Sequence, residues 1–172
     1  MAVKPILTEP NKLLRQISMP VEKITKEEQK LMDDMLDTMY EANGIGLAAI
    51  QIGIPKRIIV MDISKEEEKK TPRYFVNPVI KNKDLKKNTH EEGCLSVPNQ
   101  FAEIDRPSKC EVEYLDYNGE KQLLKADGLL ATCIQHEMDH LEGILFIDYL
   151  SKLKRSMIVK KLSKLRSNTA IL

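Results

Sequence analysis

Residues 136–140 of this 172-residue chain have the sequence His-Glu-Met-Asp-His, which is an HExxH motif. In an α-helix, side chains at positions i and i+4 lie on one face, so both imidazoles can reach a single metal ion. Glu137 would lie about 100° around the helix from His136, where it can act on a water at the metal without being a ligand. The motif therefore predicts a helix through residues 136–140 with a metal site on one face.

A catalytic metal ion also needs a third protein ligand and an open position for water. Downstream of His140 the only acidic residues are Glu142 and Asp148, and no further histidine follows. In the longer zinc motif HExxHxxGxxH, the third histidine would fall at position 146, which is Phe146. The third ligand is therefore expected upstream of the motif.

Cys94 is the favoured upstream ligand. It follows a glycine in the segment Glu-Gly-Cys-Leu-Ser at residues 92–96, and a thiolate binds soft or borderline metals strongly. His90 is the alternative ligand, and it is otherwise expected to lie in an exposed loop. Cys133 lies three residues before His136, where a ligand on the same helix would be strained. We interpret Cys133 as a small apolar residue that lines a pocket.

The composition favours a protein of the cytoplasm. The three cysteines are an odd number and no signal-peptide pattern is present, which argues against a disulfide framework. Cys110, the third of them, lies in a strand pattern and is expected in the core. No segment approaches the ~20 apolar residues of a membrane span. The net charge of only +1 excludes a global basic field that would require nucleic acid. We expect a monomer with reduced thiols.

The first long helix and the strands can be placed from local patterns. Thr25 and Glu28 form a capping-box pattern before an apolar helical periodicity, which ends at Asn43-Gly44. The charged stretches Ser64–Lys70 and Lys81–Glu92 are expected to be exposed loops. Strands are predicted at four apolar runs, of which the last two are joined by a hairpin turn at Asn118-Gly119: Arg57–Met61, Tyr74–Ile80, Cys110–Tyr117 and Lys121–Leu124.

Two more helices complete the expected order. One runs from about Gly128 to Leu141, with Asp127 as its N-cap and Gly143 as its terminator. Another begins near Ser151 and carries one apolar stripe: Leu153, Met157, Ile158, Leu162 and Leu165. A helix, several strands and two helices in this order predict an α+β fold, because a βαβ repeat would alternate them.

Three segments together resemble the motifs of the peptide deformylases, in the family's order. Residues 44–51 are similar to the family's GxGxAAxQ, residues 92–96 to EGCLS, and residues 135–140 to QHExDH. Residues 128–151 and the helical C-terminus resemble the bacterial type whose chain ends in a helix. The resemblance implies one deformylase domain over residues 1–172, with mixed or antiparallel sheets around a central HExxH helix.

The resemblance also implies the reaction and its residues. Such an enzyme hydrolyses the N-formyl group of formyl-methionine on nascent polypeptides and releases formate. Its metal is Fe²⁺ in the cell, which Ni²⁺ or Zn²⁺ can replace, and its ligands would be Cys94, His136 and His140. Glu137 would take the water proton and deliver it to the leaving amine. The Gln51 side-chain amide and the Leu95 backbone N–H would stabilise the oxyanion.

Substrate binding is expected beside the metal. Leu129 and Cys133 follow the helix face of His140 and can line an apolar pocket for methionine. Gly46 and Gly93 carry no side chain, so an extended peptide can approach their backbone and pair as an added strand. Ile45 completes the predicted substrate-binding residues.

Two positions depart from the family's pattern. Phe101 stands where many bacterial members carry an arginine, and Thr132 is more polar than the isoleucine often found there. Both changes affect the expected substrate preference, while the metal ligands and Glu137 are intact.

The C-terminal segment suggests a macromolecular partner. From Tyr149 to Leu172 there is no acidic residue, whereas the segment contains Lys152, Lys154, Arg155, Lys160, Lys161, Lys164 and Arg166. In the bacterial deformylases that this chain resembles, the C-terminal helix docks on the ribosome, and the basic residues are expected to serve that contact. The alternative is a solvated helix face.

Two other functions compete with deformylation. The HExxH motif also occurs in general metallopeptidases, against which the cysteine ligand and the glycine-rich motif argue. A catalytically silent ribosome-binding protein with a structural metal is the other alternative. An intact Glu137 and Gln51 argue against it, because a structural metal site requires neither.

Overall fold

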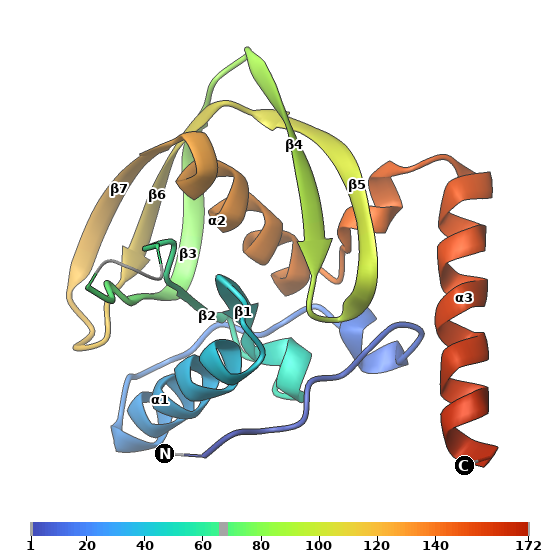
Figure 1. The fold of residues 1–172 in the computed structure, drawn as a ribbon. Coiled ribbons are helices and arrows are strands. Elements are labelled where there is room, and N and C mark those ends of the chain that lie inside the picture. Colours follow the sequence, from blue (N-terminus) through green and yellow to red (C-terminus); the bar gives the residue numbers. More distant parts are fainter. Residues whose placement is uncertain (1, 66–68, 172) are drawn as a thin grey trace.

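The computed structural model describes residues 2–65 and 69–171, with side chains described as far as Lys164 in the last helix. A five-stranded sheet has the order β1-β2-β3-β6-β7, and a separate two-stranded sheet pairs β4 with β5 (Figure 1). All pairings between these strands are antiparallel. The strands are β1 (Gly46–Ala48), β2 (Ile58–Met61), β3 (Arg73–Lys83), β4 (Lys87–Cys94), β5 (Val97–Pro107), β6 (Lys109–Leu115) and β7 (Lys121–Asp127).

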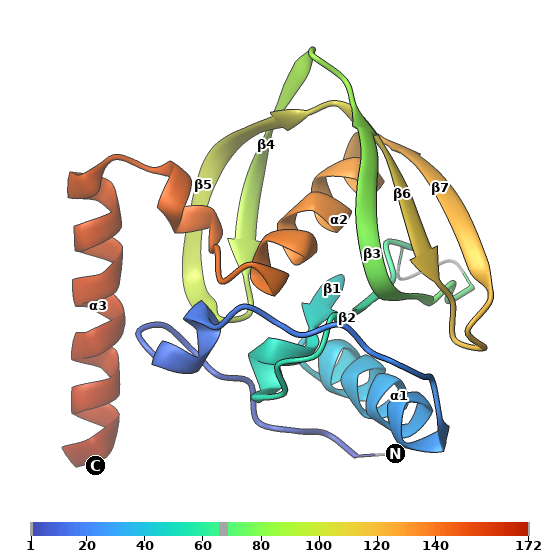
Figure 2. The same ribbon diagram turned by 180° about the vertical axis from the view of Figure 1, so that it is seen from behind.

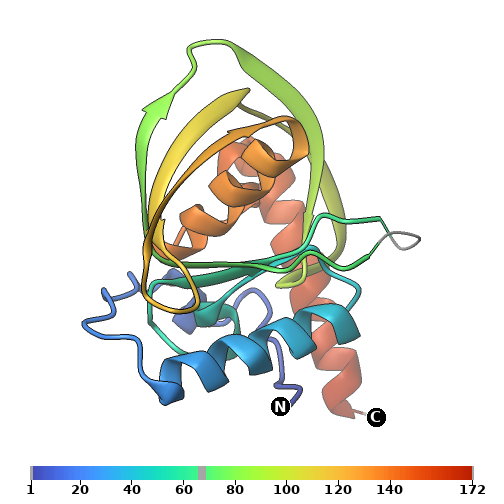
Figure 3. The ribbon, with the colours of Figure 1, turned by 90° about the vertical axis from the view of Figure 1, so that its left-hand side faces the viewer.

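Helix α2 (Gly128–Leu141), which contains the HExxH motif, lies inside the curve of the two sheets. Figure 3 shows the strands of both sheets bending around it. Its apolar residues pack on the five-stranded sheet, where Ala131 and Ile134 belong to one cluster with Phe75 and Val112. The predicted helix bounds and the α+β class are confirmed. Gly143 ends the helical segment with a φ of 73°, whereas Asp127 occupies the N-cap without a side-chain cap hydrogen bond.

Helix α1 (Lys26–Glu41) covers the other side of β1 and β2 (Figure 2). The predicted capping box of Thr25 and Glu28 is present, and Asn43 has the expected left-handed φ of 57°. Strand β2 is buried on both faces, because its alternate residues point to two cores. Ile59 packs toward α2, while Ile58 packs toward α1.

Helix α3 (Lys152–Ile171) stands at the edge of the molecule, next to β5 (Figure 1). Ile158 and Leu162 pack into a third apolar cluster with Val97 and Phe146. The predicted stripe is wrong at two positions, since Leu153 is 71% and Met157 is 51% exposed. Among the side chains described as far as Lys164, Val159 also packs against this cluster and Arg155 forms an ion pair with Asp148, whereas Leu153 and Met157 stay exposed. The side chain of Leu165 lies outside the described residues.

The expected loop at Lys81–Glu92 is the clearest error in the predicted elements. Strand β3 extends to Lys83 and β4 begins at Lys87, so most of this stretch is paired. Strand β5 was not predicted either. In β4 and β5, charged residues on an exposed face alternate with half-buried ones. Because so many of these residues are charged, the alternation typical of a strand is hard to recognise in the sequence. At Ser64–Lys70 the described part forms no strand or helix, and residues 66–68 are outside it.

Short 3₁₀ helices connect the longer elements at η1 (Lys12–Arg15), η2 (Ala49–Ile52) and η3 (Phe146–Tyr149). Across the described ranges, no helix combines the length and apolar character that crossing a membrane would require.

Candidate metal centre and active site

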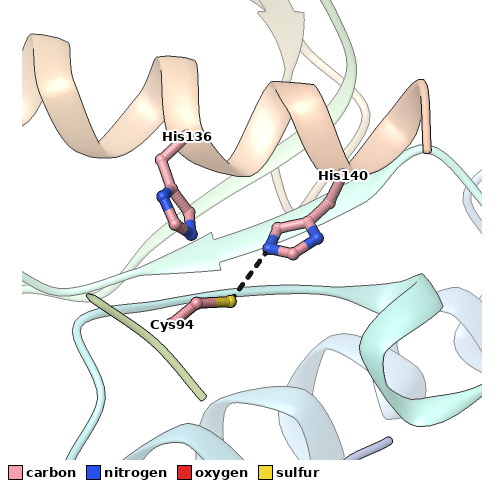
Figure 4. A group of neighbouring side chains, drawn as sticks. All are labelled: Cys94, His136 and His140. Atoms are coloured by element: carbon pink, nitrogen blue, oxygen red, sulfur yellow. Dashed lines mark hydrogen bonds between the residues drawn. The ribbon is translucent and has the colours of Figure 1, made fainter. Parts of the chain in front are cut away.

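Cys94 and the two histidines of the HExxH motif come together between β4 and α2 (Figure 4). One ligand atom from each of Cys94, His136 and His140 lies within 4.8 Å of the others. The Sγ atom of Cys94 is 3.4 Å from Nε2 of His140. His90, the alternative third ligand, does not belong to this group. The HExxH helix and the end of β4 therefore bring together the three residues predicted as ligands.

Gln51 connects this group to the turn between β4 and β5. Its Oε1 accepts a hydrogen bond from the backbone N–H of Ala48 at 2.9 Å, so the amide group is held in one orientation. Its Nε2 donates to Oγ of Ser96 at 3.0 Å and lies 3.6 Å from Sγ of Cys94. The side-chain N–H groups of Gln51, the predicted oxyanion donor, therefore lie directly beside Cys94.

A buried ionic network fixes the His136 ring from behind. Oε1 of Glu92 lies 2.9 Å from Nδ1 of His136, which leaves Nε2 for the metal group. Arg106 donates two hydrogen bonds to Glu92, at 2.6 and 3.0 Å, and a third to Asp139 at 2.8 Å. Tyr149 donates to the same Asp139 carboxylate. Partners of this kind set the tautomer and direction of a ligand histidine.

None of the residues of this network was predicted to have a role behind the ligands. Glu92 stands inside the motif at residues 92–96, and Asp139 stands inside HExxH, so both carried a signal that was left unused. Arg106 had no local signal, because it lies on β5, the strand that the sequence did not reveal.

The charges at the site favour a cation. Burial raises the pKa of Glu92, but hydrogen bonds from His136 and Arg106 outweigh it and bring the pKa below its ordinary value. Burial lowers the pKa of His136, yet the neighbouring Cys94 and Glu92 raise it well above the ordinary value. Burial lowers the pKa of His140, which keeps that ring neutral and able to bind metal. Positive charge is thus stabilised beside Cys94, where a metal ion would replace the proton.

The donor set therefore fits a divalent metal ion. One thiolate and two imidazoles are ligands that Fe²⁺, Ni²⁺ and Zn²⁺ all accept. Within the described residues, two buried polar atoms at this group, Oε2 of Glu137 and Nδ1 of His140, have no hydrogen-bond partner. Unpaired buried polar atoms of this kind are typical of functional sites that bind an ion or water.

Glu137 lies against β1, beside the metal group. Its side chain is 4% exposed, and burial raises its pKa to about 7. A Cβ atom at Gly46 would come within 2.6 Å of Oε1 of Glu137. The sequence predicts Gly46 as a place where a peptide can approach the backbone. The structure adds a steric reason, because a larger residue would displace Glu137.

A cleft of about 610 Å³ opens next to the metal group. The residues predicted to bind substrate all line it, namely Ile45, Gly46, Gly93, Leu129 and Cys133. The predicted acid/base and oxyanion residues line it as well, namely Glu137, Gln51 and Leu95. Phe101 is 65% exposed at the rim, with its ring 2.6 Å from where a Cβ of Gly93 would lie. Burial raises the pKa of Cys133, so this thiol stays protonated.

His90 occupies a different position from the one expected. It lies on β4 and not in a loop, and it is half-buried at the cleft. Its Nδ1 is 3.0 Å from the hydroxyl of Thr132 on α2. The polarity of Thr132 is visible in the sequence, but its partner His90 is 42 positions away and no local pattern connects the two.

A Cys/His/His group and a buried glutamate at one cleft of an α+β fold are the arrangement of a metal-dependent hydrolase. The sequence profile of the polypeptide deformylases matches residues 3–156. The chain therefore belongs to the polypeptide deformylase family, whose members are metalloenzymes that remove the formyl group from N-formyl peptides.

Individual relatives agree with this assignment. The peptide deformylase of Pelagibacter ubique is 80% identical over 171 residues, which are 99% of each chain. That of Rhizobium meliloti is 53% identical over 164 residues, 95% of this chain and 94% of the other. The crystal structure of the Ehrlichia chaffeensis peptide deformylase in complex with actinonin superposes with a TM-score of 0.92. It has 46% sequence identity over 95% of this chain and 98% of the other.

Proposed function

We propose that this chain hydrolyses the N-formyl group of formyl-methionine at the start of nascent polypeptides, releasing formate and a free amine. Cys94, His136 and His140 form one group at a cleft that also contains the buried Glu137, and this arrangement supports hydrolysis at a bound metal ion. The family membership supports the reaction, and the cleft supports a peptide substrate.

The metal would be held by Cys94, His136 and His140, with Glu92 holding the His136 ring. We expect Fe²⁺ in the cell, with Ni²⁺ or Zn²⁺ as functional replacements, because all three accept one thiolate and two imidazoles. When bound there, a divalent cation supplies a Lewis acid that polarises the formyl carbonyl and lowers the pKa of water.

Glu137 would move the proton. With a pKa of about 7, its carboxylate is available near neutral pH to accept a proton from the attacking water. The resulting carboxylic acid can then give that proton to the departing nitrogen as the C–N bond breaks. The Gln51 Nε2–H and the Leu95 N–H would donate to the carbonyl oxygen as negative charge develops on it.

The cleft would orient the peptide. Leu129 and Cys133 supply apolar surface for the methionine side chain, and Ile45, Gly46 and Gly93 would lie along the peptide backbone. Strand β4 pairs only with β5 among the described strands. Its other edge therefore has free backbone groups on which an extended peptide can form an added strand. Phe101 offers an apolar surface at the rim.

Helix α3 would provide the ribosome contact. Its basic side chains Lys154, Lys161 and Lys164 are exposed, and no acidic residue neutralises them within residues 149–172. Phosphate contacts from such residues would make the binding dependent on salt. The same proposal places the chain in the cytoplasm, as a monomer whose residues 1–172 form one deformylase domain.

Formate release separates this proposal from its alternatives. The chain, purified without oxygen and with its metal content measured, should release formate from a formyl-Met-Ala-Ser peptide. A general HExxH metallopeptidase would instead release amino acids or shorter peptides from unformylated Met-Ala-Ser. A catalytically silent ribosome-binding protein would release neither. Production of amino acids without formate would refute deformylation.

A further inference from the structure

A polar pair forms part of the cleft wall next to otherwise apolar residues. His90 comes from β4 and Thr132 from α2, and the Nδ1 and Oγ1 atoms are 3.0 Å apart. Both line the cleft together with Leu129 and Cys133. Thr132 is only 7% exposed, so its hydroxyl belongs to a buried part of this wall.

Either Thr132 or His90 can be the donor in this hydrogen bond, and in both cases one N–H or O–H group of the pair stays unused. If Thr132 donates to Nδ1 of His90, the neutral ring carries its proton on Nε2. If Nδ1 of His90 is protonated and donates to Thr132, the Thr132 hydroxyl keeps its own hydrogen. Thr132 and His90 make no other side-chain hydrogen bond within the described part of the chain. The pair therefore keeps a free N–H or O–H group at the wall.

We propose that this pair allows the cleft to accept formyl-methionine whose sulfur has been oxidised to the sulfoxide. This proposal rests on the proposed deformylase function and specifies its substrate class. A thioether sulfur is a weak acceptor, whereas a sulfoxide oxygen is a strong one that would be costly to bury against apolar walls alone. The free donor of the His90–Thr132 pair would satisfy that oxygen beside Leu129 and Cys133, where the proposed function puts the methionine side chain.

A purely structural role is the competing explanation. The same hydrogen bond connects β4 to α2 and could serve only to hold the cleft walls together. A hydrogen bond with only a structural role would change kcat/KM for every substrate alike, since it does not distinguish one side chain from another. A specificity pair changes the ratio between substrates, and that ratio is therefore the informative measurement.

The test compares three peptides that differ only in their first side chain: formyl-Met-Ala-Ser, its methionine sulfoxide form and its norleucine form. Formate release gives kcat/KM for each with the nickel-loaded full chain. Replacing the hydroxyl in Thr132→Val should lower the sulfoxide-to-norleucine ratio roughly three- to tenfold, the effect of about one hydrogen bond. His90→Leu should lower it similarly, and Thr132→Ser should restore the ratio of the unmodified chain.

Thr89→Val is the matched control. Thr89 is the neighbour of His90 on β4, but it is exposed, bonds to Asp105 and does not line the cleft. Its ratio should equal that of the unmodified chain. If folded Thr132→Val and His90→Leu both keep the sulfoxide-to-norleucine ratio of the unmodified chain, the pair has only a structural role and the proposal is overturned. If the unmodified chain releases no formate even from formyl-Met-Ala-Ser, the proposed function itself fails and the inference fails with it.

Discussion

Helices α2 and α3 differ in how much of their surface the rest of the chain covers. Nine of the fourteen residues of α2 are buried, and its polar residues are engaged in a network with β4 and β5. Helix α3 contacts the body through Ile158 and Leu162 and leaves Leu153 and Met157 exposed. The chemistry therefore depends on a helix whose surroundings are fixed. Helix α3 carries none of the grouped ligands, and its described basic side chains are exposed.

The largest expected effect comes from removing the proton carrier on α2. Glu137→Gln should lower the deformylation rate by ~10²–10⁴-fold or more, because general acid–base catalysis alone contributes that much. The metal content should stay near one per chain, since Glu137 is not among the grouped ligands. Formate release and metal analysis on the same preparation test both statements. Loss of metal from Glu137→Gln would make Glu137 a ligand and refute the proposed role.

Removing the thiolate should remove the metal instead. Cys94→Ser should bind Fe²⁺, Ni²⁺ and Zn²⁺ much more weakly, because a hydroxyl is a far poorer ligand than a thiolate. Cys110→Ala is the control, as Cys110 is buried in the apolar cluster away from the group. Metal titration with a competing chelator measures the difference. Equal affinity in Cys94→Ser and the unmodified chain would exclude Cys94 as a ligand.

Oxygen sensitivity gives a further measure of the same site. A thiolate on Fe²⁺ beside an open position is exposed to oxidation, so the iron form should lose activity in air. The nickel form should persist under the same conditions. Activity followed over time in air and under nitrogen checks this expectation, and equal lifetimes of the two forms would count against a cysteine–iron site.

A smaller effect on metal affinity is expected from changing Glu92, which contacts the ligand His136 and belongs to the network between α2, β4 and β5. Glu92→Gln keeps the shape of the side chain but removes its charge from between His136 and Arg106. Loss of such a partner lowers metal affinity by ~10–100-fold. Glu103→Gln on the exposed side of β5 is the control, and its affinity should not change. An unchanged affinity in Glu92→Gln would mean that the His136 ring is positioned without this contact.

The same contrast explains which features could be predicted from the sequence. On α2, the spacing of His136 and His140 fixed a helical face, and Cys94 remained as the upstream thiol. The helix bounds follow from local spacing and Cys94 from the exclusion of downstream candidates, so the helix and the grouping of these three residues could be predicted. Arg106 depends on β5, whose outer face is charged, and the contact between His90 and Thr132 depends on two elements meeting in space. Neither leaves a periodic pattern in the sequence.

On α3, the predicted apolar stripe is partly wrong because a periodic pattern is present but only part of it is covered. Leu153, Met157, Ile158 and Leu162 have the spacing of a buried stripe, yet only Ile158 and Leu162 contact the body. Periodicity predicts which residues share a helix face, but it does not predict whether a partner covers that face. The exposed Leu153 and Met157 beside basic residues are instead compatible with a surface that another molecule covers.

The smallest effect on peptide turnover is expected from removing α3. A chain ending at Leu150 keeps every residue that lines the cleft and all three grouped ligands. Turnover of short formyl-Met peptides should therefore stay largely intact, while co-sedimentation with ribosomes should weaken. The truncation also exposes the cluster that Ile158 and Leu162 cover. Because each fully buried aliphatic side chain contributes ~1.5–3 kcal/mol, the free energy of unfolding should fall, and folding must be verified by circular dichroism.

A full-length variant separates the charge of α3 from its packing. Reversing the exposed Lys154, Lys161 and Lys164 to glutamate leaves Ile158 and Leu162 in place, so stability and peptide turnover should be retained. Ribosome binding should decrease, and its dependence on salt concentration should become shallower, because fewer phosphate contacts release fewer counterions. Should both the folded truncation and this variant bind ribosomes as tightly as the unmodified chain at several salt concentrations, docking through α3 is excluded. The basic residues would then form only a solvated helix face.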